Sequence, residues 1–342
     1  MWRFVRKPGR VPRRGAEIGA HLVPEAFGAD PVLRSACDAA REGDLEAGLT
    51  LLVESRDDAE TRVLRVEALA RAMADTPGEV AALLKTGADQ ADTVLWLGHA
   101  LLARALARPA GDTKADEKGF SAALHEAAEA LRTAARLRTD DAAPWAGLQT
   151  IVMGLGAGRE EKDRIWREIT ARAPHLFPAH MVRTRTLSPS RGGSAEEMLA
   201  FAGATADTAP TGSPLPSVLA LAHAEHVRVE QKRLRAEGSS AYIVDMALGR
   251  LHGESLQELF ALARAWVAEA EPHIRDAQAH HLFGWAFHRT GMTEAARWHL
   301  TAAGTTRCDT PWSFFGPSHT ELLRAMVDLG VDPGQQDPGG RT

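Results

Sequence analysis

Apolar residues recur along this chain at the spacing of α-helices. One clear stripe places apolar side chains three and four residues apart, on a single helical face: Leu256, Leu259, Phe260, Ala263, Trp266, Val267 and Ala270. Strands favour β-branched and aromatic residues, yet the 342 residues include only one tyrosine. The pattern therefore predicts an all-α protein.

Polar residues and prolines mark where the predicted helices begin and end. Ser194, Ser255 and Ser318 each precede a glutamate by three residues, the spacing of a capping box. In such a box the serine and the glutamate satisfy backbone amides that the first turn leaves without partners. Helix ends are indicated by Pro174, Pro210, Pro272 and by Gly330 followed by Pro333.

The stretch from His280 to Cys308 matches the tetratricopeptide pattern W-x2-L-G-x2-Y, then A-x3-F. Its matching positions are His280, Phe283, Gly284 and Phe287, then Ala296 and Leu300 after a turn at Gly291. Gly284 and Ala296 stand where two antiparallel helices must touch, so a larger side chain would separate them. The sequence thus predicts an α-solenoid of tetratricopeptide-like helical hairpins.

Weaker copies of this pattern lie earlier in the chain. One copy opens at Val94 and contains Gly98, and its second helix contains Leu131. Between its two helices, residues from about 106 to 120 predict a solvated loop or a small extension of the hairpin. The next copy opens at Trp145, and its second helix contains Trp166.

A resemblance follows from segments that span most of the chain from about Trp145 onward. The segments are Gly193–Ala202, Gly284-Trp285-Ala286-Phe287 and Thr310-Pro311-Trp312-Ser313-Phe314-Phe315-Gly316-Pro317. They resemble a family of uncharacterised actinobacterial proteins with tetratricopeptide-like repeats. The resemblance implies the helical-repeat fold and implies no activity. We expect Trp312, Phe314 and Phe315 to anchor a capping helix rather than to form an exposed patch.

Bulk composition narrows the class of protein. Hydrophobic residues make up 44% of the chain, enough for a continuous core. No apolar run approaches the length of about 18 residues that indicates a membrane span. Cys37 and Cys308 lie far apart in the sequence, which argues against a disulfide framework and favours a reducing compartment. We therefore expect a cytoplasmic protein.

Charge is concentrated at the N-terminus. The first fourteen residues contain no acid and six bases: Arg3, Arg6, Lys7, Arg10, Arg13 and Arg14. Because the whole chain carries a net charge of −5, the remainder is strongly acidic. We expect residues 1–25 to be a basic flexible arm, 26–330 a single helical-repeat domain and 331–342 a disordered tail. The arm is either solvated or binds phosphate groups of nucleic acid or of an anionic membrane.

The fourteen histidines raise the possibility of a metal site. His223 and His226 share a helical face, but the H-E-x-x-H motif requires a spacing of four with an interposed glutamate. His280, His281 and His288 cluster without a cysteine or carboxylate to complete a tetrahedral set. Neither a nucleophile motif nor a phosphate-binding loop is present in the sequence. We expect no catalytic residue, metal or cofactor.

A concave groove is the expected binding site. In tetratricopeptide proteins the first helix of each repeat lines the concave face, and the alignment places seven residues there: Gln278, His281, Trp285, His288, His99, Leu95 and Met153. The alternative is that Trp285 and its neighbours pack against an adjacent helix, as aromatic stripes usually do.

Three functional hypotheses follow. The first is a non-enzymatic scaffold or adaptor that binds a protein or peptide in this groove. The second is a binder of nucleic acid or anionic membrane that depends on the basic arm. The third is a metal-dependent enzyme that uses a histidine cluster centred on His223 and His226.

Overall fold

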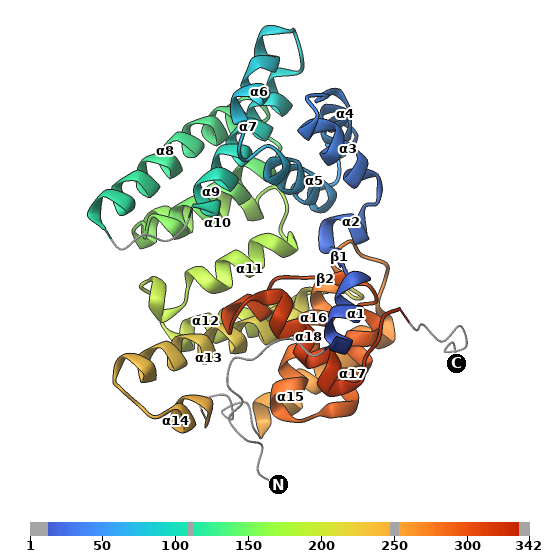
Figure 1. The fold of residues 1–342 in the computed structure, drawn as a ribbon. Helices are drawn as coiled ribbons and strands as arrows, with labels where there is room; N and C mark the ends of the chain where they lie inside the picture. The colour runs from blue at the N-terminus through green and yellow to red at the C-terminus, as the bar shows by residue number, and fades with distance from the viewer. Residues whose placement is uncertain (1–12, 109–112, 247–252, 335–342) are drawn as a thin grey trace. The chain divides into compact units, whose positions relative to one another are not determined.

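The computed structural model describes residues 13–108, 113–246 and 253–334, most of which are α-helical (Figure 1). The all-α prediction is confirmed. Chain contacts define two compact units. Unit 1 comprises Met1–Gly28 and Leu187–Thr342, and unit 2 comprises Ala29–Thr186. We expected one domain over residues 26–330. The chain divides instead because the helices of each unit pack on helices of the same unit.

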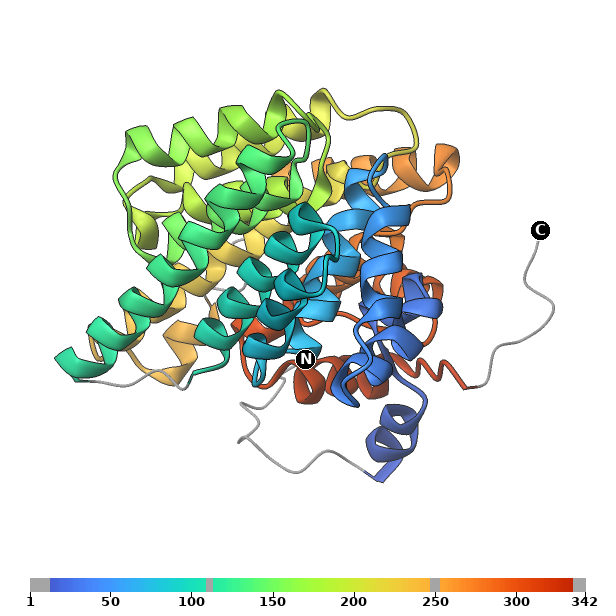
Figure 2. The ribbon, with the colours of Figure 1, turned by 90° about the horizontal axis from the view of Figure 1, so that it is seen from above.

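Unit 2 is a succession of helices, most of which pack on the next helix in sequence, while α5 packs mainly on α7 and α3. They are α3 (Val32–Arg41), α4 (Glu46–Glu54), α5 (Ala59–Ala72), α6 (Pro77–Ala82), α7 (Gln90–Ala107), α8 (Lys114–Leu137), α9 (Ala143–Gly154), α10 (Arg159–Thr170) and α11 (Phe177–Thr186). A short 3-10 helix, η1 (Leu83–Lys85), follows α6. The long helices α7 and α8 lie side by side as a hairpin (Figures 1 and 2).

Of the two alternatives for residues from about 106 to 120, the structure favours the extension of the hairpin, because α7 and α8 continue into this segment. Helix α8 begins at Lys114, because Thr113 forms a capping box with Asp116. The Thr113 Oγ1 accepts a hydrogen bond from the Asp116 backbone N–H at 3.1 Å. Both ends of the segment from about 106 to 120 are therefore helical, the first in α7 and the second in α8. Residues 109–112 lie outside the described residues.

Unit 1 also consists of helices. They are α1 (Arg13–Ala20), α2 (Glu25–Ala29, which ends at the unit boundary), α12 (Ala195–Asp207), α13 (Val218–Ala236), α14 (Ala241–Met246), α15 (Glu254–Glu269), α16 (Asp276–Thr290), α17 (Thr293–Ala302) and α18 (Ser318–Leu329). Among the described residues of this unit, 3-10 helices join them at η2 (Pro189–Arg191), η3 (Leu215–Ser217) and η5 (Trp312–Phe314). Among the described residues, no helix has both the length and the apolar character needed to cross a membrane.

The only paired strands in the described part of the chain are two residues long. Strand β1 (Val23–Pro24) pairs in parallel with β2 (Thr306–Arg307), with Val23 opposite Thr306. This pairing connects the N-terminal segment of unit 1 to the segment that precedes η5.

The predicted arm over residues 1–25 extends too far. Helix α1 begins at Arg13, and its Ile18 is buried. The helix packs on α18, where a Cβ at Gly19 would lie 3.0 Å from Nε2 of His319. Burial of this apolar face fixes the segment. Four basic residues of the predicted arm lie outside the described residues: Arg3, Arg6, Lys7 and Arg10. Helix α1 begins with Arg13 and Arg14, whose side chains also lie outside the described part of the chain.

The predicted tail over residues 331–342 also begins too early. Val331 is buried, and its backbone N–H donates to the carbonyl of Met326 at 2.9 Å, closing the end of α18. Gly330 adopts a left-handed conformation with φ of 70°, which lets the chain leave the helix and return toward it. Residues 335–342 lie outside the described part of the chain.

Glycines allow two helical hairpins to close tightly. In the α16–α17 hairpin, a Cβ at Gly284 would lie 2.8 Å from Cδ2 of Leu300. In the α7–α8 hairpin, a Cβ at Gly98 would lie 2.7 Å from Cδ2 of Leu131. Both glycines and both leucines occupy the positions that the repeat pattern aligned. The predicted close approach at Gly284 is therefore confirmed.

Candidate functional site

The residues expected in a concave groove are mostly buried. Trp285 and His281 are each 0% exposed and lie in unit 1, where Trp285 stacks on Phe315 with ring centroids 5.0 Å apart. Leu95 of unit 2 is also buried, at 1% exposure. The prediction that these side chains line an open groove is wrong, because apolar packing within each unit covers them.

His281 has a structural role that its hydrogen bonds define. Its Nε2 lies 2.8 Å from the carbonyl oxygen of Thr306, and its Nδ1 accepts from Trp312 Nε1 at 3.2 Å. Nε2 must therefore carry the proton, which makes the ring a neutral tautomer. Trp312 is buried, so the expectation that this aromatic segment packs inward is confirmed for Trp312.

The remaining groove candidates are divided between the two units. In unit 1, Gln278 is buried near Thr310, and His288 is half-buried with Nε2 3.9 Å from Oδ2 of Asp328. In unit 2, Met153 is buried, and His99 Nε2 lies 3.2 Å from the carbonyl oxygen of Ala143. Burial lowers the pKa of His99.

The histidines of unit 1 do not assemble a larger ligand cluster. Burial lowers the pKa of His223 to about 4, and the neighbouring His226 contributes to this shift. Within the described residues, no group of three or more histidine, cysteine, aspartate or glutamate side chains is placed to hold a metal ion. The structure thus adds no third ligand to the His223 and His226 pair.

A second histidine pair lies among aromatic rings. Nδ1 of His280 on α16 lies 2.9 Å from Nδ1 of His299 on α17. The ring of Trp266 is 4.8 Å from the His280 ring, and the ring of Trp298 is 4.9 Å from the His299 ring. Burial lowers the pKa of His280 to about 4 and that of His299 to about 3. Both rings are therefore neutral at neutral pH, and one donates a hydrogen bond to the other.

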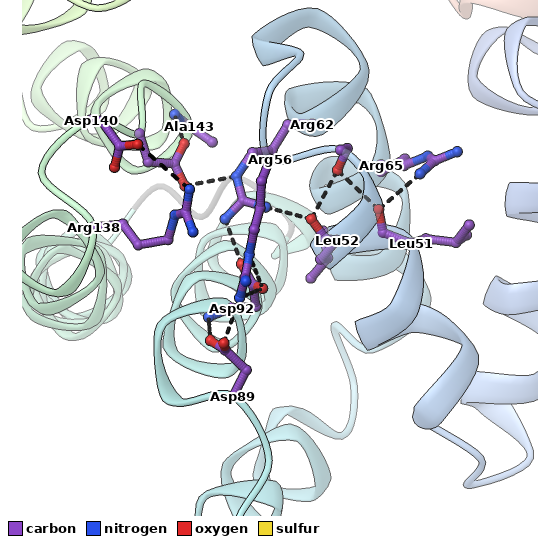
Figure 3. A network of polar contacts seen from close by, with 12 residues as sticks. Leu51, Leu52, Arg56, Arg62, Arg65, Asp89, Asp92, Arg138, Asp140 and Ala143 are labelled. Carbon is purple, nitrogen blue, oxygen red and sulfur yellow. Dashed lines mark hydrogen bonds and ion pairs between the residues drawn. The ribbon is translucent and has the colours of Figure 1, made fainter.

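Unit 2 contains a buried ion network that joins four segments (Figure 3). Arg62 on α5 is 1% exposed. Its guanidinium donates to Asp141 Oδ2 at 2.7 Å, to Asp92 Oδ1 at 2.5 Å and to the carbonyl oxygen of Leu52 at 2.6 Å. Arg56 also donates to Asp92, at 2.6 Å. Because every ionised group has a partner of opposite charge, the network is a structural junction.

The network fixes the start of α9. Asp141 Oδ1 accepts a hydrogen bond from the backbone N–H of Ala143 at 2.8 Å. Arg172 holds the same segment from the other side, since its Nε donates to the carbonyl oxygen of Thr139 at 2.6 Å. These bonds restrain the backbone immediately before Trp145.

Trp145 forms the wall of an open pocket in unit 2. The pocket has a volume of about 180 Å³ and lies between α8, α9 and α10; its lining consists of Arg132, Ala135, Arg136, Trp145 and Arg164. We call this the Trp145 pocket. The Arg164 guanidinium carbon lies 5.7 Å from the centroid of the Trp145 ring, and that of Arg172 lies 5.2 Å from it. Two cations therefore contact one half-buried indole.

The arginines of the Trp145 pocket are oriented by glutamates on their own helices. Arg164 donates to both carboxylate oxygens of Glu161, each at 2.8 Å. Arg132 donates to Glu129 at 2.6 Å. The hydrogen bond from Arg164, with the charges of Arg164 and Arg132, lowers the pKa of Glu161. The same hydrogen bond raises the pKa of Arg164. Both residues are thus ionised over the physiological pH range.

The sequence alone does not reveal this pocket, although it contains part of the signal. Its repeat pattern marks Trp145 only as the start of a repeat. Arg132 and Arg136 are four residues apart, which places them on one helical face, and Arg164 follows Glu161 by three. What the sequence could not provide was the convergence of α8 and α10 on the same indole.

Comparisons with protein-family models, with curated proteins and with solved structures give no match to this chain. The function must therefore be argued from the chemistry of the site.

Proposed function

We propose that the protein is a non-enzymatic scaffold of tetratricopeptide-like hairpins that binds a protein partner at the Trp145 pocket. The single observation that carries this proposal is the open pocket lined by Trp145, whose ring is also close to the guanidiniums of Arg164 and Arg172. The proposal moves the partner site from the concave groove, whose expected residues are mostly buried, to a surface between α8, α9 and α10.

The repeat architecture has support from two hairpins. Gly98 of α7 approaches Leu131 of α8 in the same way as Gly284 of α16 approaches Leu300 of α17. In both hairpins the leucine of the second helix packs against the glycine of the first. Repeated hairpins present extended surfaces to partners, so this architecture is compatible with a binding role.

The composition of the pocket also supports partner binding. Tryptophan and arginine are enriched among the interface residues that contribute most to affinity. A half-buried indole offers a large contact area and loses little side-chain entropy when it binds. The bonds of Arg172 to Thr139 and Glu168 hold the wall of the pocket in place before any partner arrives. Such preorganisation favours affinity.

A cytoplasmic location is part of the proposal. Both Cys37 and Cys308 are buried free thiols. Burial raises the pKa of Cys37 to about 11, which leaves that thiol protonated and unreactive at neutral pH. Two unpaired buried thiols are compatible with a reducing compartment.

An affinity experiment tests the proposed function. Full-length protein is immobilised, exposed to native lysate, and retained proteins are quantified by mass spectrometry. We expect a protein retained in stoichiometric amount, whose retention falls about tenfold or more in Trp145→Ala, as for an interface hot spot. The control is Trp298→Ala, which removes a tryptophan of unit 1 that is 49% exposed.

A second variant distinguishes loss of the binding site from misfolding of the protein. Arg136→Glu changes an exposed side chain at the same pocket and leaves the core intact. Circular dichroism verifies the helix content of each variant. Equal retention of the partner by wild type and by both pocket variants would rule out this site, and retention of no stoichiometric protein would contradict the scaffold function.

A further inference from the structure

We infer that the group of the partner that enters the Trp145 pocket is an oxyanion, either a carboxylate or a phosphate, carried by a side chain of the partner. This inference rests on the proposed function for the identity of the partner as a protein. The chemistry of the pocket itself is independent of that assignment.

The pocket has hydrogen-bond donors that the protein leaves available. Each guanidinium carries five N–H groups and no acceptor. Within the described residues, Arg132 uses Nη1 for Glu129, and Arg136 uses Nη2 for the hydroxyl of Thr133. Arg164 uses Nε and Nη2 for Glu161. Several N–H groups of each arginine therefore remain to bind oxygen atoms of a ligand.

The pocket also has positive charge that its acids do not balance. Arg132 and Arg164 each have a glutamate partner, but Arg136 forms no ion pair with any described residue. An exposed guanidinium without an anionic partner, next to two further guanidiniums, attracts an anion. Arginine is the side chain best suited to carboxylate and phosphate, because its planar fork can donate two parallel hydrogen bonds.

The existing ion pairs do not block the site. The Arg132–Glu129 pair has side-chain exposures of 39% and 73%, and both its members lie on one helix. Exposed pairs of this kind contribute little to stability, so an incoming anion can exchange with the glutamate at little loss. Arg164 keeps its pair with Glu161 and can still present its third nitrogen.

Trp145 should favour a ligand in which the oxyanion is attached to an apolar ring. Its ring provides an apolar surface beside the guanidiniums, so a ligand that carries both a ring and an oxyanion can satisfy both features. Phenyl phosphate and benzoate are such probes, and benzyl alcohol is the uncharged control. These small molecules require no partner protein, and they report on the pocket directly.

The experiment is a titration of the full-length chain, labelled with ¹⁵N at its indole nitrogens. The Trp145 indole resonance is identified by its absence in Trp145→Phe. We expect saturable shifts of this resonance with phenyl phosphate or benzoate. The double variant Arg132→Gln/Arg136→Gln should weaken anion binding about tenfold, since it removes two charged donors. Arg104→Gln, which alters another partly exposed arginine of unit 2 paired with a glutamate, should leave it unchanged.

The possible results distinguish a phosphate from a carboxylate and test the inference separately from the proposed function. A shift with phenyl phosphate alone assigns a phosphate source, and a shift with both anions shows that a carboxylate suffices. The inference is overturned if neither anion shifts Trp145, if benzyl alcohol binds equally well, or if Arg104→Gln weakens binding as much as the double variant. A pocket that binds oxyanions in a protein that retains no partner would contradict the proposed function alone.

Discussion

The indole N–H of Trp312 donates a hydrogen bond to Nδ1 of His281 at 3.2 Å, and both side chains are buried in unit 1. The opposite nitrogen of the same imidazole lies 2.8 Å from the carbonyl oxygen of Thr306. One neutral histidine thus joins helix α16 to β2 and to η5. This arrangement explains why a histidine occupies a fully buried position.

Replacement of His281 by alanine should destabilise unit 1. The variant leaves the Trp312 N–H and the Thr306 carbonyl without a partner and opens a cavity, and we expect a loss of about 3 kcal/mol in the free energy of unfolding. Urea unfolding monitored by tryptophan fluorescence measures the loss. His125→Ala, at an exposed position of unit 2, is the control and should change stability by about 0.5 kcal/mol or less.

The same histidine should make stability depend on pH. Burial lowers the pKa of His281 to about 4, from an ordinary value of 6.5. Between these values the unfolded chain binds a proton that the folded chain does not, so the free energy of unfolding decreases as pH falls. One such histidine contributes at most about 1.4 kcal/mol per pH unit.

Urea unfolding of wild type and of His281→Gln at pH 7.5, 6 and 5 isolates this contribution. The variant should lose less stability than the wild type between pH 6 and 5, because it cannot bind the proton. Identical pH dependence in the two proteins would show that His281 does not titrate in this way.

The buried ion network of unit 2 should be sensitive to the loss of its arginine. Arg62→Met removes the buried guanidinium that Asp92 and Asp141 share, and we expect a loss of about 3–5 kcal/mol. Arg41→Met is the matched control, because Arg41 forms an exposed ion pair with Asp38. Denaturant unfolding that gave equal, small losses for both variants would show that the network does not stabilise the junction.

The contact between α16 and α17 at Gly284 should not tolerate an added methyl group. In Gly284→Ala the new Cβ would lie 2.8 Å from Cδ2 of Leu300, so the Leu300 side chain must shift or the two helices must move apart. We expect a loss of about 1–3 kcal/mol, as for overpacked cores. Gly203→Ala on α12 is the control, because no described atom lies within 4 Å of a Cβ there.

The change in the free energy of unfolding should differ between Gly203→Ala and Gly284→Ala in sign as well as in size. Alanine is favoured over glycine inside a helix by about 0.5–1 kcal/mol, so Gly203→Ala should be neutral or stabilising. Thermal unfolding measures both variants. A stabilising Gly284→Ala would mean that α16 and α17 do not touch at this point.

Local features of the sequence predicted part of the helix boundaries. The predicted caps Ser255 and Ser318 are wrong, because these serines are helical residues of α15 and α18, whose N-caps are Gly253 and Pro317. Ser194 accepts from the backbone N–H of Glu197 at 3.0 Å, as its capping spacing indicated. Gly284 and Leu300 meet as the repeat pattern required. Both features depend on residues close together in the chain. The capping box at Thr113 carried the same kind of signal, and its recognition would have placed the start of α8 correctly.

The sequence by itself determined the all-α class, part of the helix boundaries and the tight hairpins, because helical hydrogen bonds and capping act over three to five residues. Tertiary structure decided which faces are covered. Trp285 was compatible with a groove or a core, and the tertiary structure buries it and stacks it on Phe315, thirty residues later. The Trp145 pocket likewise exists because α8 and α10 bring Arg132 and Arg164 to one indole, and burial and charge convergence depend on contacts distant in sequence.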